Sequence, residues 1–403
     1  MAEMNNKKKD LNVPPLRFPE FKGEWGDTAL GATCTGFDYG LNSPAVDFDG
    51  VNQYIRITDI NDETGELNAN SITSPKKINF DSLVKENDIL FARTGASVGK
   101  TYLQQNSDPN VYFAGFLIRA NVKPEFDPYF VYSETKTQRY LSWVKLMSMR
   151  SGQPGINSKE YMSFKFKIPL KEEQRKIGEL LKLIDARIKV QRKNIEVYKS
   201  SFLSFLSEII KKHLTSKTDL IKNLGEPFTT GNLSWDDVSN EGKTPCVLYG
   251  QLFTDYKIFI DQAKSYTNKD EGYISEGNEV IFPSSTTADA LSLIAPCAVI
   301  SQGILLGGDM FGIKLNPNYD PIFISAILQT EYQGELAKKA QGSTIIHLHY
   351  DDIKNIPVKV PTLSIQKEIS KMIVSLFKTI ANEAKVLTAL ENLKRYLLAG
   401  LFC

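Results

Sequence analysis

Two stretches of this chain carry apolar residues at the alternating four- and three-residue steps of a heptad repeat. This spacing is typical of long helices that pack along a continuous seam. The first pattern also runs on through Tyr198, Phe202, Phe205 and Ile209. The predicted seam positions are Ile177, Leu181, Ile184, Ile188, Gln191 and Ile195 in the first stretch and Ile369, Ile373, Leu376, Ile380, Glu383 and Leu387 in the second.

The two seams are copies of each other. They start 192 positions apart, at Ile177 and Ile369, and each has a polar residue, Gln191 or Glu383, at its fifth position. Short peptides recur in the same order at nearly the same offset, which predicts an internal duplication. The recurring pairs are 87–91 with 278–282, 124–130 with 317–323, 167–169 with 359–361, and Gln174 with Gln366.

The duplication predicts an α+β fold with pseudo-two-fold symmetry. Short β-prone runs separated by Gly, Asn, Asp and Ser precede each long helix, which predicts two strand-rich domains. The two helices are expected to pair antiparallel, with Gln191 and Glu383 close together. The predicted divisions are a flexible leader 1–25, a first domain 26–170, a spacer helix 171–213, a second domain 214–362 and a C-terminal spacer helix 363–403. A further helix is expected over 126–147.

Composition excludes several classes of protein. The net charge is +1, so any surface for nucleic acid must be local. One such region is the first long helix, which has 11 Lys and Arg against 6 Asp and Glu between Lys171 and His213. The four cysteines show no metal-ligand spacing, so we expect free thiols in a reducing compartment. Without an apolar run of membrane length, the sequence predicts a soluble, cytoplasmic protein.

Three motifs resemble catalytic or metal sites, and each is incomplete. Residues 95–101 resemble a phosphate-binding loop, but three residues separate the glycines where four are needed. Residues 316–319 resemble the Asn-Pro-Pro-Tyr motif of adenine methyltransferases, but the third residue is Asn318. His347 and His349 lack a third candidate metal ligand nearby. We therefore expect no catalytic, cofactor or metal site in this chain.

Polar, glycine-containing loops occupy matching places in both predicted domains. Arg, Lys, Ser, Thr and Gln on such loops suit contacts to phosphates and base edges, although solvated loops have the same composition. The candidate binding residues are Arg93, Thr94, Ser97, Lys100, Arg150, Ser151 and Gln153 in the first domain, and Ser284, Ser285, Thr286, Thr287, Lys338, Lys339, Ser343 and Thr344 in the second.

Four segments of the chain match a known pattern: 13–21 with Trp25, the Ser151–Ile156 loop, Ile168–Ile177 at the start of the first long helix, and the weaker copy Val360–Ile369. In these segments the chain resembles the specificity (S) subunits of type I restriction–modification systems. The likeness covers nearly the whole sequence, but the second copy has Gly342-Ser343-Thr344 where the first has Gly-Gln-Pro-Gly.

The resemblance implies a DNA-binding subunit without catalytic activity. Each domain would be a target recognition domain that reads one half of a split, asymmetric site in double-stranded DNA. The helices would set the gap and dock two modification subunits, which bind S-adenosylmethionine and methylate adenine. Restriction subunits using ATP and Mg²⁺ would join the assembly. The alternative is a coiled-coil scaffold with two heads that bind other ligands; salt-sensitive DNA affinity would distinguish the two.

Overall fold

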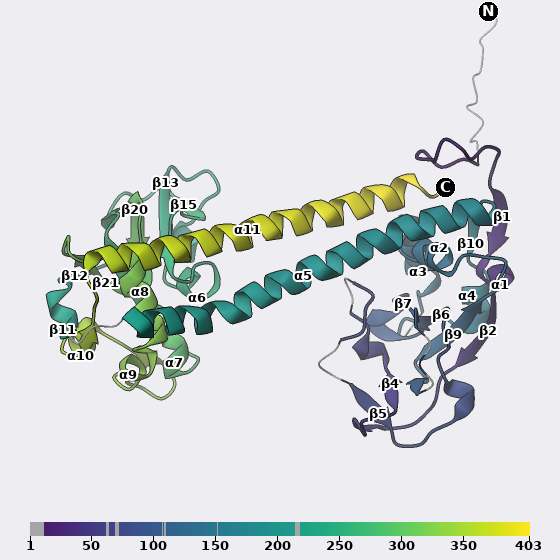
Figure 1. Ribbon diagram of the computed structural model, residues 1–403, viewed down its shortest axis with the longest axis horizontal. Helices are drawn as coiled ribbons and strands as arrows, with labels where there is room; N and C mark the ends of the chain where they lie inside the picture. The colour runs from purple at the N-terminus through teal and green to yellow at the C-terminus, as the bar shows by residue number, and fades with distance from the viewer. Residues whose placement is uncertain are drawn as a thin grey trace, which may run out of the picture. The chain divides into compact units, whose positions relative to one another are not determined.

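The computed structural model describes residues 12–61, 64–68, 72–106, 108, 110–150, 152–213 and 218–403. The chain divides into two compact units: unit 1 contains the residues up to Arg192 and Val386–Cys403, and unit 2 contains Lys193–Lys385. Each unit has a strand-rich head and a segment of both long helices (Figure 1). The first eleven residues of the predicted leader lie outside the described residues, and the domain boundaries stay predictions.

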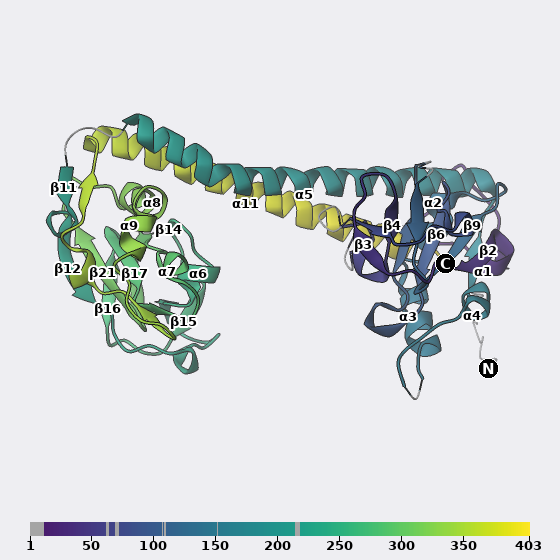
Figure 2. The same cartoon turned by 90° about the horizontal axis from the view of Figure 1, so that it is seen from below.

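The two long helices are α5 (Lys171–His213) and α11 (Leu363–Gly400), and they run antiparallel within each unit (Figures 1 and 2). In unit 1, Lys394 contacts Asp185 at 2.5 Å and Glu391 contacts Arg192 at 2.5 Å. Later residues of α5 therefore contact earlier residues of α11, as antiparallel pairing requires. In unit 2, the Phe202 and Phe377 rings pack edge to face with centroids 5.1 Å apart. The predicted pair of long helices in contact is thus confirmed.

Burial follows the heptad positions along most of both helices. In α5, Ile177, Leu181, Ile184, Ile188, Gln191 and Ile195 are all at most 9% exposed. In α11, Ile369 and Ile373 are 2% exposed, and Leu376, Ile380, Glu383 and Leu387 are half-buried. The proximity expected for Gln191 and Glu383 stays a prediction.

The α5 seam leaves the heptad pattern near its end. Phe205 is 54% exposed, whereas Leu206 and Ile210 are at most 3% exposed. After Phe202 the buried positions therefore follow at steps of four residues, at Leu206 and Ile210, and the expected step of three to Phe205 is lost. The reason is that a straight helix has 3.6 residues per turn and drifts from a seven-residue repeat. This part of α5 packs on the unit 2 head as well as on α11.

The unit 1 head is built on an antiparallel sheet in the order β2-β9-β6-β7. Its central strand β6 (Asp88–Ala92) is buried throughout, with Ile89 and Phe91 in one apolar cluster and Leu90 and Ala92 in another. The first cluster also takes in residues of α2, α3 and α4, the start of α5 and the end of α11. The other strands of this sheet are β2 (Cys34–Tyr39), β7 (Thr101–Leu103) and β9 (Leu117–Val122).

Smaller strand pairs complete unit 1. Strand β1 pairs with β10, which leads directly into α5, while β3 pairs with β5 and β4 with β8. The bounds are β1 (Gly26–Ala29), α1 (Leu30–Thr33), β3 (Ala45–Asp47), β4 (Gln53–Ile55), β5 (Thr73–Pro75), β8 (Val111–Phe113), α2 (Pro128–Glu134), α3 (Gln138–Met147), α4 (Ser158–Met162) and β10 (Lys165–Ile168).

The unit 2 head repeats this plan with additions. Its sheet β12-β21-β17-β19-β14 contains four strands in the places of β2-β9-β6-β7, and β11 pairs with β23 before α11 as β1 pairs with β10 before α5. A second sheet, β15-β13-β20-β16, packs on its other face. The main-sheet strands are β12 (Gly225–Thr229), β14 (Phe259–Ile260), β17 (Glu279–Pro283), β19 (Cys297–Val299) and β21 (Met310–Leu315).

The remaining elements of unit 2 are short. Helix α8 covers the main sheet in the place that α2 holds in unit 1. The bounds are β11 (Thr218–Leu220), β13 (Thr244–Leu248), α6 (Gln251–Thr254), β15 (Ser265–Thr267), β16 (Tyr273–Glu276), β18 (Ser285–Thr286), α7 (Ala290–Leu293), β20 (Gln302–Gly307), α8 (Pro321–Thr330), α9 (Gln333–Ala337), β22 (Ile346–His347), α10 (Tyr350–Ile353) and β23 (Pro357–Lys359).

The duplication extends to individual hydrogen bonds at the start of each long helix. Gln174 Oε1 accepts from the Asp127 backbone N–H at 3.0 Å, and its Nε2 donates to the Pro169 carbonyl at 2.8 Å. Gln366 makes the same two bonds to Asp320 and Pro361, at 2.9 and 2.8 Å. Each glutamine thus joins its long helix to the head, which explains why the recurring peptides contain it.

Residues 12–25 pack against unit 1. The Arg17 guanidinium binds both oxygens of the buried Glu173 carboxylate at 2.8 Å, and the Trp25 indole lies against the Phe130 ring. The Leu16 backbone N–H donates to the Gly400 carbonyl at 2.8 Å. This segment therefore ties the start of α5 to the end of α11.

The helix expected over 126–147 is two helices, α2 and α3. The chain turns between them because Thr137 caps α3, accepting from the Tyr140 N–H at 3.3 Å. Among the described residues, no helix is both long and apolar enough to cross a membrane.

Candidate nucleic-acid interface

The two candidate loops of unit 1 lie side by side. Thr94 forms an isolated antiparallel bridge with Gly155, and the Gly95 N–H donates to the Pro154 carbonyl at 2.9 Å. Gln153 lies beside them, because a Cβ added to Gly95 would be 3.0 Å from its Nε2. The structure thus brings together Arg93, Thr94 and Gln153, which are far apart in the sequence.

The corresponding loops of unit 2 also meet. Strands β18 and β22 pair Ser285 with His347 and Thr286 with Ile346. The Gln341 and His347 backbones exchange hydrogen bonds of 2.9 and 2.7 Å. The buried Ser284 and the segment that follows Lys338 and Lys339 therefore belong to one surface region.

Backbone hydrogen bonds establish that Arg93 and Ser284 occupy equivalent positions. The Arg93 N–H donates to the Phe116 carbonyl at 3.0 Å, and the Ser284 N–H donates to the Asp309 carbonyl at 2.8 Å. Their carbonyls accept at 2.9 Å from Ile156 and Leu348, respectively. The duplicated heads therefore present different side chains on the same backbone framework.

Arg93 is held over an aromatic ring. Its guanidinium carbon lies 4.6 Å from the centroid of Tyr39, which is 46% exposed, and its Nη1 donates to the Gly115 carbonyl at 3.3 Å. Tyr39 donates to Ser158 Oγ at 3.5 Å and accepts from the Ser158 N–H at 3.3 Å. The Ser158 hydroxyl contact, together with the Arg93 charge, lowers the pKa of Tyr39. A cation stacked on a ring in this way is partly fixed before any ligand arrives.

A β-bulge turns the end of β2 toward this position. The register with β9 shifts between Gly36 and Asp38, and Phe37 adopts a left-handed conformation (φ 64°). Such backbone costs about 1–3 kcal/mol and is concentrated at functional sites. The bulge fixes which face of the strand Asp38 and Tyr39 occupy.

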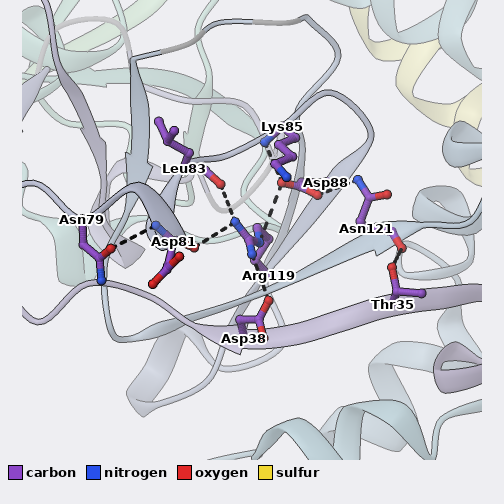
Figure 3. Close-up of polar contacts among 9 residues, drawn as sticks. All are labelled: Thr35, Asp38, Asn79, Asp81, Leu83, Lys85, Asp88, Arg119 and Asn121. Carbon is purple, nitrogen blue, oxygen red and sulfur yellow. Dashed lines mark hydrogen bonds and ion pairs between the residues drawn. The ribbon is translucent and has the colours of Figure 1, made fainter.

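Arg119 then holds the bulged strand in place (Figure 3). Its Nη2 donates to Asp38 Oδ2 at 2.9 Å, and its Nη1 donates to the carbonyls of Leu83 and, at 3.2 Å, Asp81. The neighbouring Asp88 carboxylate accepts from Asn121 Nδ2 at 2.7 Å, and burial raises its pKa. This network joins β2, β6 and β9 to residues 79–85 and holds Asp38, the neighbour of Tyr39 in β2.

Exposed aromatic residues lie next to glycines in both heads. Phe116 follows Gly115 and is 62% exposed; in unit 2, Trp235 is 58% exposed and lies against Gly250. The Tyr249 ring, 36% exposed, lies next to Gly308. Neither these three residues nor Tyr39 were among the candidates predicted from the sequence. The available signal was an aromatic beside a glycine in a turn, as in Tyr39-Gly40, Gly115-Phe116 and Tyr249-Gly250.

The other candidate residues differ in their exposure and in the contacts that they already make within the protein. Arg150 is ion-paired with Glu160 at 2.5 Å and donates to two backbone carbonyls. Lys100 is half-buried, and burial lowers its pKa. Ser151 lies outside the described residues. Ser97, Ser285 and Thr286 are half-buried, and Thr287, Lys338, Lys339, Ser343 and Thr344 are exposed.

The incomplete motifs take ordinary structural roles. Residues 95–101 form the turn of the β6–β7 hairpin, so no α-helix follows to cradle a phosphate. A Cβ on Gly99 would lie 2.4 Å from Val144, so this glycine permits close packing on α3. The His347 and His349 rings are 6.2 Å apart. Within the described ranges, no three His, Cys, Asp or Glu side chains form a group that could hold a metal ion.

These features define a duplicated α+β protein with two loop-bearing heads and a pair of long helices. The model of the type I restriction modification DNA specificity domain matches the chain twice, over residues 41–199 and 195–392. The chain therefore belongs to this family, as the sequence resemblance predicted. It is a DNA specificity subunit of a type I restriction–modification system, a non-catalytic subunit of a methyltransferase and endonuclease complex.

Known relatives cover most of the chain. The type I restriction enzyme MjaVIII specificity subunit of Methanocaldococcus jannaschii is 22% identical over 355 residues, covering 79% of both chains. The crystal structure of the S subunit from M. genitalium has a TM-score of 0.60 at 16% identity, covering 97% of this chain and 99% of that one. A structure on complex assembly and conformational transition of the type I system has a TM-score of 0.56 at 14% identity, covering 95% and 98%. These structures share the fold.

Proposed function

We propose that each head reads one half of a bipartite, asymmetric DNA sequence. The observation that carries this proposal is the pairing of the same two loops in both heads on one backbone framework, with Arg93 in one head and Ser284 in the other. A duplicated framework suits two similar docking modes, because phosphate positions do not depend on sequence. Different side chains at equivalent positions suit two different base sequences.

We further propose that α5 and α11 set the gap between the half-sites and dock two modification subunits. In unit 2 the two helices line an apolar groove of about 450 Å³ that contains Phe205 and Met372, which are 54% and 48% exposed. Exposed apolar surface of this kind suits a partner protein. On this proposal, S-adenosylmethionine binds to the modification subunits, whereas ATP and Mg²⁺ serve the restriction subunits.

DNA binding by the assembled complex tests the first proposal. We expect affinity for a fragment with the complete site to exceed that for a scrambled fragment by at least 10³-fold, and both affinities to fall steeply with added salt. Mapping methylated adenines in DNA from cells with the complete system should yield two specific half-sites separated by a gap of fixed length. A continuous site, or affinity insensitive to salt, would contradict the proposal and favour heads that bind other ligands.

A further inference from the structure

We infer that Arg93 is a specificity-determining residue that reads a guanine in the half-site of the first head, with Tyr39 as its positioning residue. This inference rests on the proposed function and names its chemistry at one position. Arg93, Tyr39 and Phe116 form the relevant surface, which we call the Arg93 face.

The guanidinium of Arg93 is held in place, but most of its N–H donors make no hydrogen bond among the described residues. Its central carbon lies over the Tyr39 ring, 4.6 Å from the ring centroid, and the bond to the Gly115 carbonyl uses Nη1. Within the described part of the chain this is the one hydrogen bond from the Arg93 side chain. The guanidinium carries five N–H donors in a planar fork, so most remain for a ligand with two adjacent acceptors.

Guanine is the base that matches this fork. In the major groove its O6 and N7 are both acceptors, whereas adenine offers one acceptor beside a donor, cytosine a donor, and thymine one acceptor beside a methyl group. The Tyr39 ring under the guanidinium is 46% exposed, and Phe116, whose carbonyl accepts from the Arg93 backbone N–H, is 62% exposed. Such apolar surface can lie against neighbouring bases.

The comparison between heads separates base reading from phosphate binding. Every half-site has phosphates, so a phosphate contact is expected to be shared by duplicated heads. Arg93 has no counterpart, because Ser284 occupies its backbone position and is 6% exposed. The carbonyl partner of Arg93 comes from Phe116, and that of Ser284 comes from Asp309. The Arg93 face therefore carries information specific to the first head.

Arg93 also differs from the other arginines on this side of unit 1. Arg150 is neutralised by Glu160 at 2.5 Å, and Arg119 donates to Asp38 and to two backbone carbonyls. Arg93 has neither a carboxylate partner nor a structural network among the described residues. It is the arginine of this surface that is both fixed and available.

The test is methylation mapping and competition binding with the complete assembly, using DNA substituted base by base. With Arg93→Ala we expect one guanine position of one half-site to lose roughly 5- to 150-fold discrimination. All other positions, and the whole second half-site, should keep their preferences. Arg93→Lys should lose the same discrimination, because a lysine keeps the charge but cannot bind two acceptors in a fork. Its retained charge should leave the salt dependence unchanged.

Variants of the supporting ring test the positioning role. Tyr39→Phe keeps the ring and should retain discrimination at that guanine, whereas Tyr39→Leu should lose several-fold of it at the same position. Lys145→Ala is the matched control, since Lys145 is an exposed cation of unit 1 outside the Arg93 face. It should leave every base preference unchanged. Thermal melting of each variant identifies any loss caused by unfolding.

Two results overturn the inference. One is uniform weakening on all sequences by Arg93→Ala, with the salt slope reduced by about one, which identifies a phosphate contact. The other is unchanged discrimination in both Arg93 variants. In either case a wild-type map with two half-sites leaves the proposed function intact. A wild-type complex without sequence preference would contradict both the inference about Arg93 and the proposed function.

Discussion

Gly178 illustrates how tightly the first head is joined to α5. A Cβ at this position would lie 2.3 Å from Asp127 Oδ1 and 3.2 Å from the Phe130 backbone N. Asp127 caps α2 by accepting from that N–H at 2.8 Å. In unit 2 the equivalent residue, Ser370, donates to Asp320 Oδ1 at 2.5 Å, so a hydroxyl contact replaces the close approach.

We expect Gly178→Ala to destabilise unit 1. The new methyl group would displace the Asp127 cap, and the resulting strain of about 1–3 kcal/mol exceeds the roughly 1 kcal/mol that alanine gains in a helix. Urea unfolding monitored by hydrogen exchange should show the loss in unit 1. Gly334→Ala in α9 is the control, because nothing lies within 4 Å of the added Cβ. Equal stability of both variants would contradict this account of the contact.

Two side chains of the candidate site show what the sequence could and could not predict. Arg93 was a candidate because arginine in a glycine-containing loop suits nucleic acid. Tyr39 was missed, since its exposure and its place beneath Arg93 depend on the bulge at Phe37 and on Arg119 from a distant strand. Such long-range positioning leaves no periodic signal in the sequence.

The long helices were the elements most accurately predicted, because heptad spacing is local and repeated over many turns. Phe205 departs from the prediction, since the end of α5 packs on two neighbours and its buried positions shift by one residue. The break between α2 and α3 was missed because apolar spacing continues across it. The sequence signal for this break was Thr137, the N-cap residue of α3. It is easy to overlook because the turn before it is short.

The exposed Phe205 leads to a prediction about partner docking. We expect Phe205→Glu to weaken co-purification of the modification subunits at least tenfold, because a charge would enter the apolar groove of unit 2. The matched control is Val197→Glu, which changes an exposed apolar residue of α5 that does not line the groove. Equal loss of binding in both variants, or in neither, would contradict docking at this groove.

For the chain as a whole, the duplication was the decisive sequence signal. It predicted two related heads, each followed by one long helix. The structure adds that Gln174 and Gln366, which recur in the sequence, join each head to its helix. The order of strands within the heads was not predicted, since pairing of short strands depends on contacts between distant segments. The second sheet of unit 2 enlarges a strand pair of unit 1, since β13 and β20 pair in parallel as β4 and β8 do.

On the proposed function, the two helices measure the gap between the half-sites. If they set the gap, lengthening both by the same amount should move the half-sites apart and leave each head's reading unchanged. One heptad adds about 10 Å of helix, which corresponds to about three base pairs of DNA. The heptad keeps the seam in phase, so pairing of the helices is preserved.

The most direct test of bipartite reading is a methylation map of cells with the complete system and this lengthened chain. One heptad is inserted between Arg192 and Lys193 in α5 and another between Lys385 and Val386 in α11, where the two units divide. We predict the same two half-sites as the wild type, with the gap longer by about three base pairs. An unchanged gap, or altered sequence within either half-site, would contradict the account.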